Sequence, residues 1–510
     1  MQYPMFDIDF PDPDVIRVDN TYYMLSTSMY FFPGCEILSS NDLISWKHET
    51  YVFDTLDGTP AQKLDDGNIY GKGMWAASLR FHNGVFYVCF VANDTHSTYL
   101  FRSEKVTGPW IMNKVEGFYH DCSLLFDDDD KVYIAYGNRQ IYITELNKEL
   151  TAPQIGGFHK MVVEDLLNNN LGYEGTHFYK INGIYYLFFI HSLEGKWYRS
   201  EACYYSRSLS EEFVGSEVFT DDFGYRNSGI AQGAIVDTPS GDWYAILFQD
   251  RGGSGRIPYL IPMKFDKILP EIGCEQKNTL QCCRPSKDSI NNTKTKACKD
   301  RISCGLTGSD DFKTVYNTDS CFGFSNKWQF NHEPDMSLIT RNTKEGYISV
   351  KTDRICKTPA EAKNTLTQRM SEVIPSAEIT VDASCLNEGD YAGFTALQYL
   401  YGFIGITKES DCYNIVFMEK PSPEENDTIT IIEKSPTPLV TFKITTSFGG
   451  EDDFAQFSYD CGQGFKTLDI KKSLPFMLEH FTGYRYALTV FSTKTAGKSA
   501  SFSNFRYQKD

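Results

Sequence analysis

The first half of the chain repeats one pattern five times: an apolar strand, a polar turn and an aromatic strand. Turns such as Asn83-Gly84 and Asn182-Gly183 between alternating apolar residues are typical of β-hairpins. The copies read DPDVIRVDNTYYML, WAASLRFHNGVFYVCF, DCSLLFDDDDKVYIAY, EGTHFYKINGIYYLFF and QGAIVDTPSGDWYAIL, and their second strands contain Tyr23, Tyr87, Tyr133, Tyr186 and Tyr244. Sequence repeats of about 20 to 50 residues or slightly more indicate solenoids, propellers or arrays.

Each repeat leaves room for two further strands, for example Tyr99–Arg102 in the second repeat. Four strands in each of five units predict a five-bladed β-propeller over residues 1–270. Helical patterns are scarce before residue 270, which argues against a βαβ fold. The alternative is a β-sandwich in which the hairpins recur by coincidence.

A second domain is expected because 510 residues exceed what one hydrophobic core usually organises. A polar segment, 271–310, has the composition of a linker. Beyond it, short apolar strands such as GYISVKT and YALTVFS alternate with turns. This pattern predicts a lectin-like β-sandwich over residues 311–510, so the whole chain is expected to be all-β.

The repeats place chemically active side chains at one shared position. Counting back twelve residues from the last four anchor tyrosines, and eleven from the first, gives Asp12, Trp75, Asp121, Glu174 and Gln232. Because the innermost strands of a propeller line its central channel, these side chains should converge. Three crowded carboxylates would acquire different pKa values, which separates an acid from a base. Glycoside hydrolysis requires such a pair.

Acids at strand starts also serve as local hydrogen-bond acceptors for backbone N–H groups, and this structural role is the alternative. A role in blade register would favour the same short residue in every repeat. Three acids, a tryptophan and a glutamine at equivalent positions argue for chemistry instead.

The same segments resemble glycoside hydrolase family 43. The resemblance runs through PDPDVIRVDNTYYML, WAASLRFHNGVFYV, DCSLLFDDDDKVYIAYG, YEGTHFYKINGIYYL and the fifth repeat, and it continues in DYAGFTALQYLYGFIGITK near the C-terminus. It points to β-xylosidases and α-L-arabinofuranosidases with a C-terminal β-sandwich. It implies Asp12 as general base, Asp121 as the residue that tunes and orients the acid, and Glu174 as general acid, acting with inversion. Asp14 competes with Asp12, because strand alternation places both on one face.

Supporting residues follow from the pattern and from the resemblance. Trp75 offers a flat wall for a sugar ring, unless it is a core tryptophan. Arg256 resembles the family arginine that holds a sugar hydroxyl, unless it lies at the surface. The run Met29-Tyr30-Phe31-Phe32 is expected at the pocket rim, with Met29, Phe31 and Phe32 as substrate-binding candidates, although relatives more often carry Phe-Glu-Trp-Phe there.

No cofactor is expected to be required. Gln232 stands where many family members have a histidine that contacts a water or a calcium ion on the axis. An amide oxygen can bind calcium, so a structural calcium on the axis stays compatible with the sequence, although the substitution weakens that expectation. Five cysteines between 274 and 304 match no tetrahedral zinc motif.

Charge and hydropathy restrict the partners. The net charge of −18 argues against binding to nucleic acid, which requires clustered Lys and Arg, and against binding to anionic membranes. No apolar run approaches the length of a membrane span, and no secretory signal is visible at the N-terminus. Together with scattered cysteines that are expected to be free thiols, this predicts a cytoplasmic protein.

The predicted function is therefore exo-acting hydrolysis, with a small oligosaccharide as the only expected partner. The predicted products are terminal α-L-arabinofuranose, β-D-xylose or both, released from (arabino)xylo-oligosaccharides. The alternatives are a non-catalytic sugar-binding propeller and an endo-acting arabinanase. A retaining fructan-active propeller would need an Asn-Asp-Pro-Asn motif, which Pro11-Asp12-Pro13-Asp14 does not supply.

Overall fold

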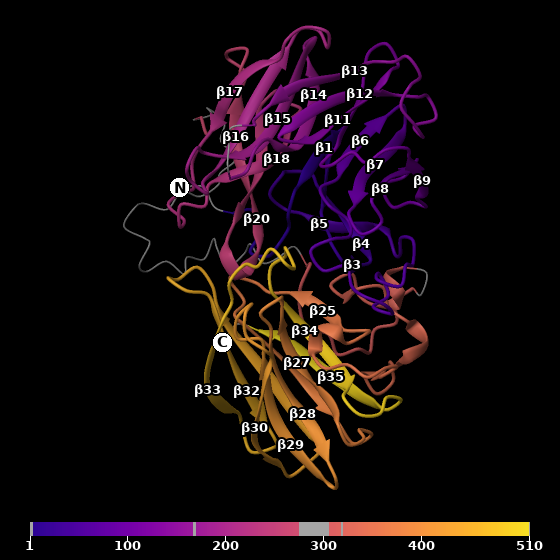
Figure 1. Cartoon of the computed structure of the whole chain (residues 1–510), viewed down its shortest axis with the longest axis vertical. Helices are drawn as coiled ribbons and strands as arrows, with labels where there is room; N and C mark the ends of the chain where they lie inside the picture. The colour runs from indigo at the N-terminus through magenta and orange to yellow at the C-terminus, as the bar shows by residue number, and fades with distance from the viewer. Residues whose placement is uncertain (1–3, 167–169, 275–304, 318–319, 509–510) are drawn as a thin grey trace.

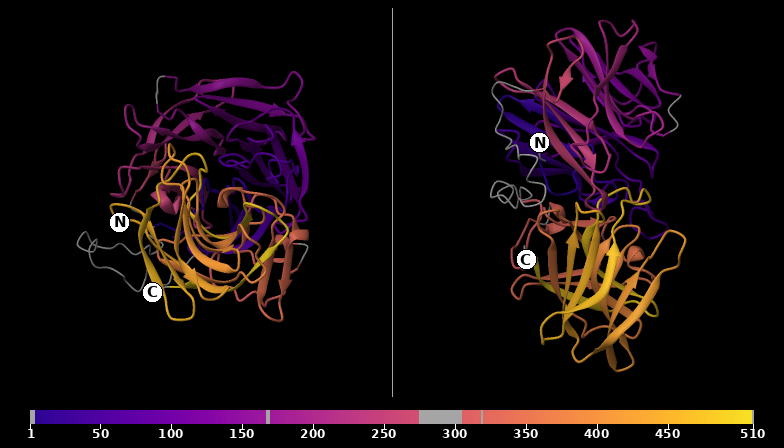
Figure 2. Two further views of the ribbon diagram at one scale, coloured as in Figure 1. Left: turned by 60° about the horizontal axis from the view of Figure 1, so that its bottom comes forward. Right: turned by 90° about the vertical axis from the view of Figure 1, so that its left-hand side faces the viewer.

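The structure is a computed structural model that describes residues 4–166, 170–274, 305–317 and 320–508. It confirms an all-β chain with a five-bladed propeller followed by a β-sandwich. Figure 1 shows the propeller in indigo to magenta above the sandwich in orange to yellow, and Figure 2 shows the same two parts from below and from the side.

Each blade is a four-stranded antiparallel sheet. The first three blades contain β1 (Asp14–Val18), β2 (Thr21–Ser26), β4 (Gly34–Ser40) and β5 (Lys47–Phe53); β6 (Ser78–His82), β7 (Val85–Ala92), β8 (Ser97–Ser103) and β9 (Ile111–Val115); and β10 (Ser123–Phe126), β11 (Val132–Asn138), β12 (Gln140–Leu146) and β13 (His159–Glu164). The last two contain β14 (Glu174–Ile181), β15 (Ile184–Ser192), β16 (Arg199–Ser206) and β17 (Val214–Phe219); and β18 (Ile230–Asp237), β19 (Trp243–Asp250), β20 (Arg256–Lys264) and β21 (Glu271–Ile272).

The repeated hairpins are the two inner strands of each blade. The anchor tyrosines occupy equivalent places in the second strand, where Tyr23 lies opposite Ile16 and Tyr133 opposite Leu125. The innermost strands β1, β6, β10, β14 and β18 contact one another in sequence, and β18 contacts β1, so the ring is closed. The residues counted from the tyrosines therefore lie within three residues of the start of five strands around one axis.

An arginine ties the inner strands together. The Arg80 guanidinium donates hydrogen bonds to Asp14 Oδ2 (2.8 Å) in the first blade and to the Leu124 carbonyl (2.7 Å) and Ser123 Oγ (2.6 Å) in the third. Its side chain is only 11% exposed. A buried guanidinium is tolerated when its N–H groups are hydrogen-bonded, and these contacts supply the acceptors.

The sandwich consists of two antiparallel sheets. In sheet order, the eight-stranded sheet contains β3 (Phe31–Phe32), β22 (Gln329–Asn331), β25 (Leu366–Arg369), β34 (Arg485–Ser492), β27 (Asp390–Leu397), β28 (Gly402–Glu409), β29 (Cys412–Glu419) and β30 (Thr428–Ser435). The seven-stranded sheet contains β23 (Ile339–Asn342), β24 (Tyr347–Lys351), β35 (Ser499–Gln508), β26 (Ser376–Asp382), β31 (Leu439–Ser447), β32 (Phe454–Asp460) and β33 (Lys466–Ser473).

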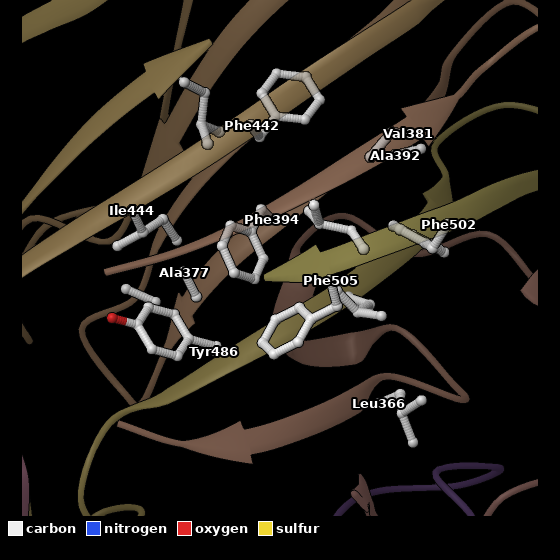
Figure 3. Close-up of a cluster of buried hydrophobic side chains, with 14 of the residues drawn as sticks. Leu366, Ala377, Val381, Ala392, Phe394, Phe442, Ile444, Tyr486, Phe502 and Phe505 are labelled. Atoms are coloured by element: carbon white, nitrogen blue, oxygen red, sulfur yellow. The ribbon is translucent and has the colours of Figure 1, made fainter. Parts of the chain in front are cut away.

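The sandwich core lies between these sheets. Phe394 and Tyr486 from the larger sheet pack with Phe442 and Phe505 from the smaller one, as Figure 3 shows. The rings of Phe394 and Tyr486 are stacked with centroids 5.5 Å apart. Alternating apolar residues on both inner faces explain why the second half of the sequence has strand periodicity.

The two domains share a sheet. Strand β3 leaves the first blade and pairs with β22, so Phe32 lies opposite Phe330 at one edge of the sandwich. An ion pair between Glu36 of β4 and Arg369 of β25 joins the same surfaces at 2.9 Å, and both side chains are buried. The domains therefore meet through backbone pairing and buried charge.

The described ends of the expected linker pack against the two domains. Glu271 and Ile272 complete the fifth blade as β21, while Leu306 packs among buried residues of the first and fifth blades. Asp310 pairs with Phe505 of the sandwich. Cys274 is described as a half-buried free thiol, and the other cysteines of the zinc alternative, at 282, 283, 298 and 304, lie outside the described residues.

Helical structure in the described residues consists of short 3-10 turns. They are η1 (Gly252–Ser254), η3 (Cys321–Gly323), η4 (Met336–Leu338) and η5 (Pro359–Glu361). Within these described ranges, no helix has the length and apolar character needed to cross a membrane.

Candidate active site

Three of the five equivalent positions share an uncommon backbone conformation. Asp12, Asp121 and Gln232 have φ of 49°, 48° and 59°, and Gly175, directly after Glu174, has φ of 65°. Positive φ is unfavourable for residues with a Cβ and is concentrated at functional sites, at a cost of about 1–3 kcal/mol each. The repeat therefore sets a common turn at the entrance of the inner strand.

Asp12 forms a buried ion pair with Arg256, the first residue of β20. Arg256 Nη1 donates to Asp12 Oδ1 at 2.6 Å, and the side chains are 3% and 4% exposed. Burial raises the pKa of Asp12; Arg256 opposes this rise, while the charges of Asp9 and Glu174 add to it. Burial removes the water that would stabilise a charge here, and the arginine favours the ionised carboxylate instead. A general base requires this ionised form.

Glu174 and Asp121 lie on either side of His120. His120 Nε2 is 3.6 Å from Asp121 Oδ2 and 3.8 Å from Glu174 Oε2, within ion-pair range but longer than a hydrogen bond. Asn138 Nδ2 donates to Glu174 Oε2 at 2.5 Å, and the Gly175 amide donates to Asp121 Oδ2 at 3.1 Å. The Glu174 side chain is 20% exposed, so it is open to a ligand.

Burial and neighbouring charge set the protonation of this group. Burial lowers the pKa of His120, but Asp121 and Glu174 outweigh it and raise that pKa to about 9. Burial raises the pKa of Asp121 to about 6, opposed by His120 and assisted by the charges of Glu174 and Asp12. At neutral pH, these shifts favour the imidazolium form of His120 and the carboxylate form of Asp121.

Two aromatic rings, from different domains, lie beside these groups. The Trp75 ring centroid is 5.6 Å from the His120 ring and 5.7 Å from the ring of Phe481. Phe481 belongs to the segment 474–484 between β33 and β34 of the sandwich. The Arg256 guanidinium lies 4.4 Å from the Phe481 ring centroid, and its Nη2 donates to the Phe481 carbonyl at 3.2 Å.

Within the run Met29–Phe32, Met29 pairs with the residue before Trp75, whereas Phe31 and Phe32 lie at the contact between the two domains. Met29 forms a backbone bridge with Met74, the neighbour of Trp75, through hydrogen bonds of 3.1 Å in both directions. Phe31 and Phe32 form β3 and are each 1% exposed. The Phe31 ring lies 3.4 Å below the Arg485 guanidinium of the sandwich, so the structure assigns these two rings to the domain contact.

Asp14 contacts the inner strands of neighbouring blades. It is fully buried, accepts hydrogen bonds from the Leu79 amide (2.6 Å) and from Arg80, and lies 3.4 Å from His177 Nδ1. Burial raises the pKa of Asp14, but Arg80 and His177 outweigh it and leave that pKa lowered. The contacts of Asp14 therefore support the propeller axis, whereas those of Asp12 face Arg256 and the site.

Gln232 contributes to the floor beside Glu174. Its backbone amide donates to Glu201 Oε2 at 2.7 Å, and its side chain fills the space that a Cβ on Gly175 would occupy, 2.5 Å from Gln232 Cδ.

Among the described residues, one set of three acidic, histidine or cysteine ligands lies within 4.8 Å: His120, Asp121 and Glu174. A cation at this set would have to displace the proton of His120, because only the neutral imidazole has a lone pair to offer.

Counting along the repeats finds one residue in each blade and misses its neighbours. His120 directly precedes Asp121, and this adjacency is the only signal in the sequence that could have identified it. Asn138 lies at the end of β11 and Phe481 comes from the other domain, so neither carries a local signal.

The comparisons with known proteins place both domains in known families. The family described as "Glycosyl hydrolases family 43" matches residues 1–267, and "Beta xylosidase C-terminal Concanavalin A-like domain" matches residues 323–508. The chain belongs to glycoside hydrolase family 43, with a concanavalin A-like second domain, and it is a glycosidase of the xylosidase/arabinofuranosidase group.

Three similar proteins align with nearly the whole of this chain. A β-xylosidase of Formosa agariphila is 23% identical over 561 aligned residues, covering 99% of this chain and 90% of its own length. A bifunctional GH43-CE protein of Bacteroides eggerthii is 33% identical with a TM-score of 0.87, covering all of this chain, which in turn spans 64% of that protein. An engineered family 43 hydrolase, described as displaying endo-xylanase and exo-arabinofuranosidase activity, is 25% identical with a TM-score of 0.82 and 99% coverage of both chains.

Proposed function

We propose that this protein is an exo-acting, inverting glycosidase that releases terminal α-L-arabinofuranose, β-D-xylose or both from (arabino)xylo-oligosaccharides. Asp12 is the general base, Glu174 is the general acid, and Asp121 tunes and orients that acid. The observation that carries the proposal is the different pairing of the two carboxylates. Asp12 is buried against a guanidinium, while Glu174 is partly open and hydrogen-bonded to a neutral amide.

The reaction follows from these environments. Glu174 protonates the glycosidic oxygen as the bond to the anomeric carbon breaks, and Asp12 takes a proton from a water that attacks the opposite face of the sugar. Inversion requires the two carboxyl groups to be roughly 6.5–9.5 Å apart, which leaves room for that water. Asp12 and Glu174 belong to the first and fourth of five blades, so they are separated by the fifth blade.

Exo action is supported by the position of the sandwich segment 474–484. Phe481 contacts Trp75 and Arg256, so an element of the second domain covers one side of the carboxylates. Flat rings bury the apolar faces of a sugar, while the charged groups contact its hydroxyls. An element that covers one side of the site favours a chain end over a chain interior.

The first test compares the wild type with Glu174→Gln and Asp12→Asn on nitrophenyl α-L-arabinofuranoside, nitrophenyl β-D-xyloside and xylobiose. Loss of an acid or base costs about 10²–10⁴-fold, so both variants should fall by that amount on xylobiose. Proton NMR of the first product should show the inverted anomer. Retained configuration would contradict the mechanism, and wild-type protein that binds these sugars without hydrolysing them would favour the non-catalytic alternative.

A further inference from the structure

His120 is the one cation in contact with the Asp121–Glu174 pair among the described residues. Its Nε2 is almost equidistant from the two carboxylates, at 3.6 and 3.8 Å, and its ring is held against Trp75. The side chain is 17% exposed, so it is shielded from water without being sealed off. The proton transfers proposed for Glu174 and Asp12 do not involve this residue.

The charged neighbours of His120 come from two blades. Asp121 and Cys122 follow it in the third blade, and Glu174 faces it from the start of β14 in the fourth. Burial and contact with Cys89 keep the Cys122 thiol neutral by raising its pKa well above its usual value. The Trp75 ring of the second blade is uncharged, and the next charged pair around the site is Asp12 with Arg256.

We propose that His120, as an imidazolium, is a positioning residue that holds Asp121 and Glu174 side by side and makes Glu174 a stronger proton donor. This inference rests on the proposed function. It concerns only the position and proton-donating strength of Glu174, and it leaves the roles of Asp12 and Glu174 unchanged.

The physical reason is the change of charge during proton transfer. Glu174 becomes an anion when it gives its proton to the glycosidic oxygen, and a cation 3.8 Å away stabilises that anion.

The experiment is the pH dependence of kcat/KM for the wild type, His120→Gln and His120→Arg. His120→Gln removes the cation, so the Asp121–Glu174 pair should release its proton at higher pH. The alkaline limb should move upward by roughly one pH unit, the size expected for loss of an opposite charge at this distance. His120→Arg restores the cation and should return the limb toward its wild-type position. His159→Gln, an exposed histidine in β13, is the matched control and should leave the profile unchanged.

The leaving group supplies an independent readout. A dinitrophenyl xyloside needs little protonation, whereas xylobiose needs full acid assistance. His120→Gln should lose about 10-fold or more in kcat on xylobiose and about 2-fold or less on the dinitrophenyl substrate. Equal losses on both substrates, with unmoved pH limbs, would overturn the inference and assign His120 a purely structural role.

Failure of the inference and failure of the proposed function give different results. If Glu174→Gln shows the large xylobiose-selective loss while His120→Gln does not, only the role of His120 is wrong. If neither variant shows leaving-group dependence, the acid assignment fails as well. Thermal melting of each variant checks folding; if His120→Gln does not fold, His120→Asn is measured in the same assays.

Discussion

At the residue scale, the site separates two carboxylates by giving them different cations. Asp12 is paired with the Arg256 guanidinium, whereas Asp121 lies beside His120, whose pKa is raised to about 9 by Asp121 and Glu174. In the proposed reaction, Arg256 opposes the rise that burial causes in the pKa of the base Asp12, and the acid side of the site responds to the protonation of His120. Protein fields that push two carboxyl groups apart in this way define acid and base roles.

Replacing Arg256 tests the first arrangement. In Arg256→Met, the charge that opposes the rise in the pKa of Asp12 is lost, so that pKa should rise further. Because the base must be ionised, the acidic limb of kcat/KM should move to higher pH while the alkaline limb stays. Arg256→Lys should move it less, since it keeps the charge. An acidic limb that is identical in all three proteins would contradict a role for Arg256 in ionising Asp12.

The three acids could be predicted from the sequence because repeat register is a local property of the chain. Counting from the tyrosines selected Asp12, Asp121 and Glu174, which the structure brings to one ring of strands. Strand parity alone could not choose between Asp12 and Asp14, although the repeat register and the family motif both selected Asp12. The structure adds the contact of Asp14 with Arg80, whose hydrogen bonds to other blades appear only when the ring is closed.

At the element scale, the segment 474–484 is the part of the sandwich that completes the site. The Gly483 amide donates to Asp9 Oδ2 at 3.0 Å, while Asp9 Oδ1 accepts from the Arg256 amide at 2.7 Å. One carboxylate thus joins this segment to β20, the strand that carries Arg256. The position of Phe481 is therefore fixed relative to Asp12 by hydrogen bonds through Asp9.

Removing the Phe481 ring should weaken substrate binding more than chemistry. In Phe481→Ala, the ring contacts with Trp75 and Arg256 are lost. We expect KM to rise about 10-fold, which corresponds to ~1.4 kcal/mol of lost binding, with a smaller change in kcat. Phe465→Ala, an exposed ring in the turn between β32 and β33, is the control. An unchanged KM in Phe481→Ala would exclude this segment from the substrate site.

At the scale of the whole molecule, the two domains are joined as one structure. Strand β3 of the propeller region lies in a sandwich sheet, and the ion pair of Glu36 with Arg369 is buried beside it. The sequence predicted both domains correctly, because strand periodicity and turns are local. It did not predict that β3 pairs with the sandwich, because two aromatic residues after a strand are compatible with a pocket rim as well as with a domain contact.

Breaking the interdomain ion pair should destabilise the protein. Glu36→Gln leaves the Arg369 guanidinium buried without its carboxylate, which typically costs about 3–5 kcal/mol. Asp237→Asn breaks the half-exposed pair with Arg17 and should cost less than about 1 kcal/mol. Chemical denaturation of both variants measures the difference. Similar free energies of unfolding for the two would contradict a structural role for the Glu36–Arg369 pair.

The same pair gives stability a definite pH dependence. Burial raises the pKa of Glu36, but Arg369 and His48 outweigh it and leave that pKa below its ordinary value. The stability that Glu36 contributes is therefore complete above the unfolded-state pKa and is lost as pH falls through the folded-state pKa. Glu36→Gln should have a shallower loss of stability below pH ~4 than the wild type.

The shared β3–β22 edge constrains how this chain can be recombined with its relatives. A chimera joined within the segment 271–310 would receive a foreign partner for Phe31 and Phe32, although its crossover lies some 240 residues away from them. Exchanges that carry β3 and β22 from the same parent should assemble, whereas exchanges that separate them should leave an unmatched strand edge next to the catalytic blades.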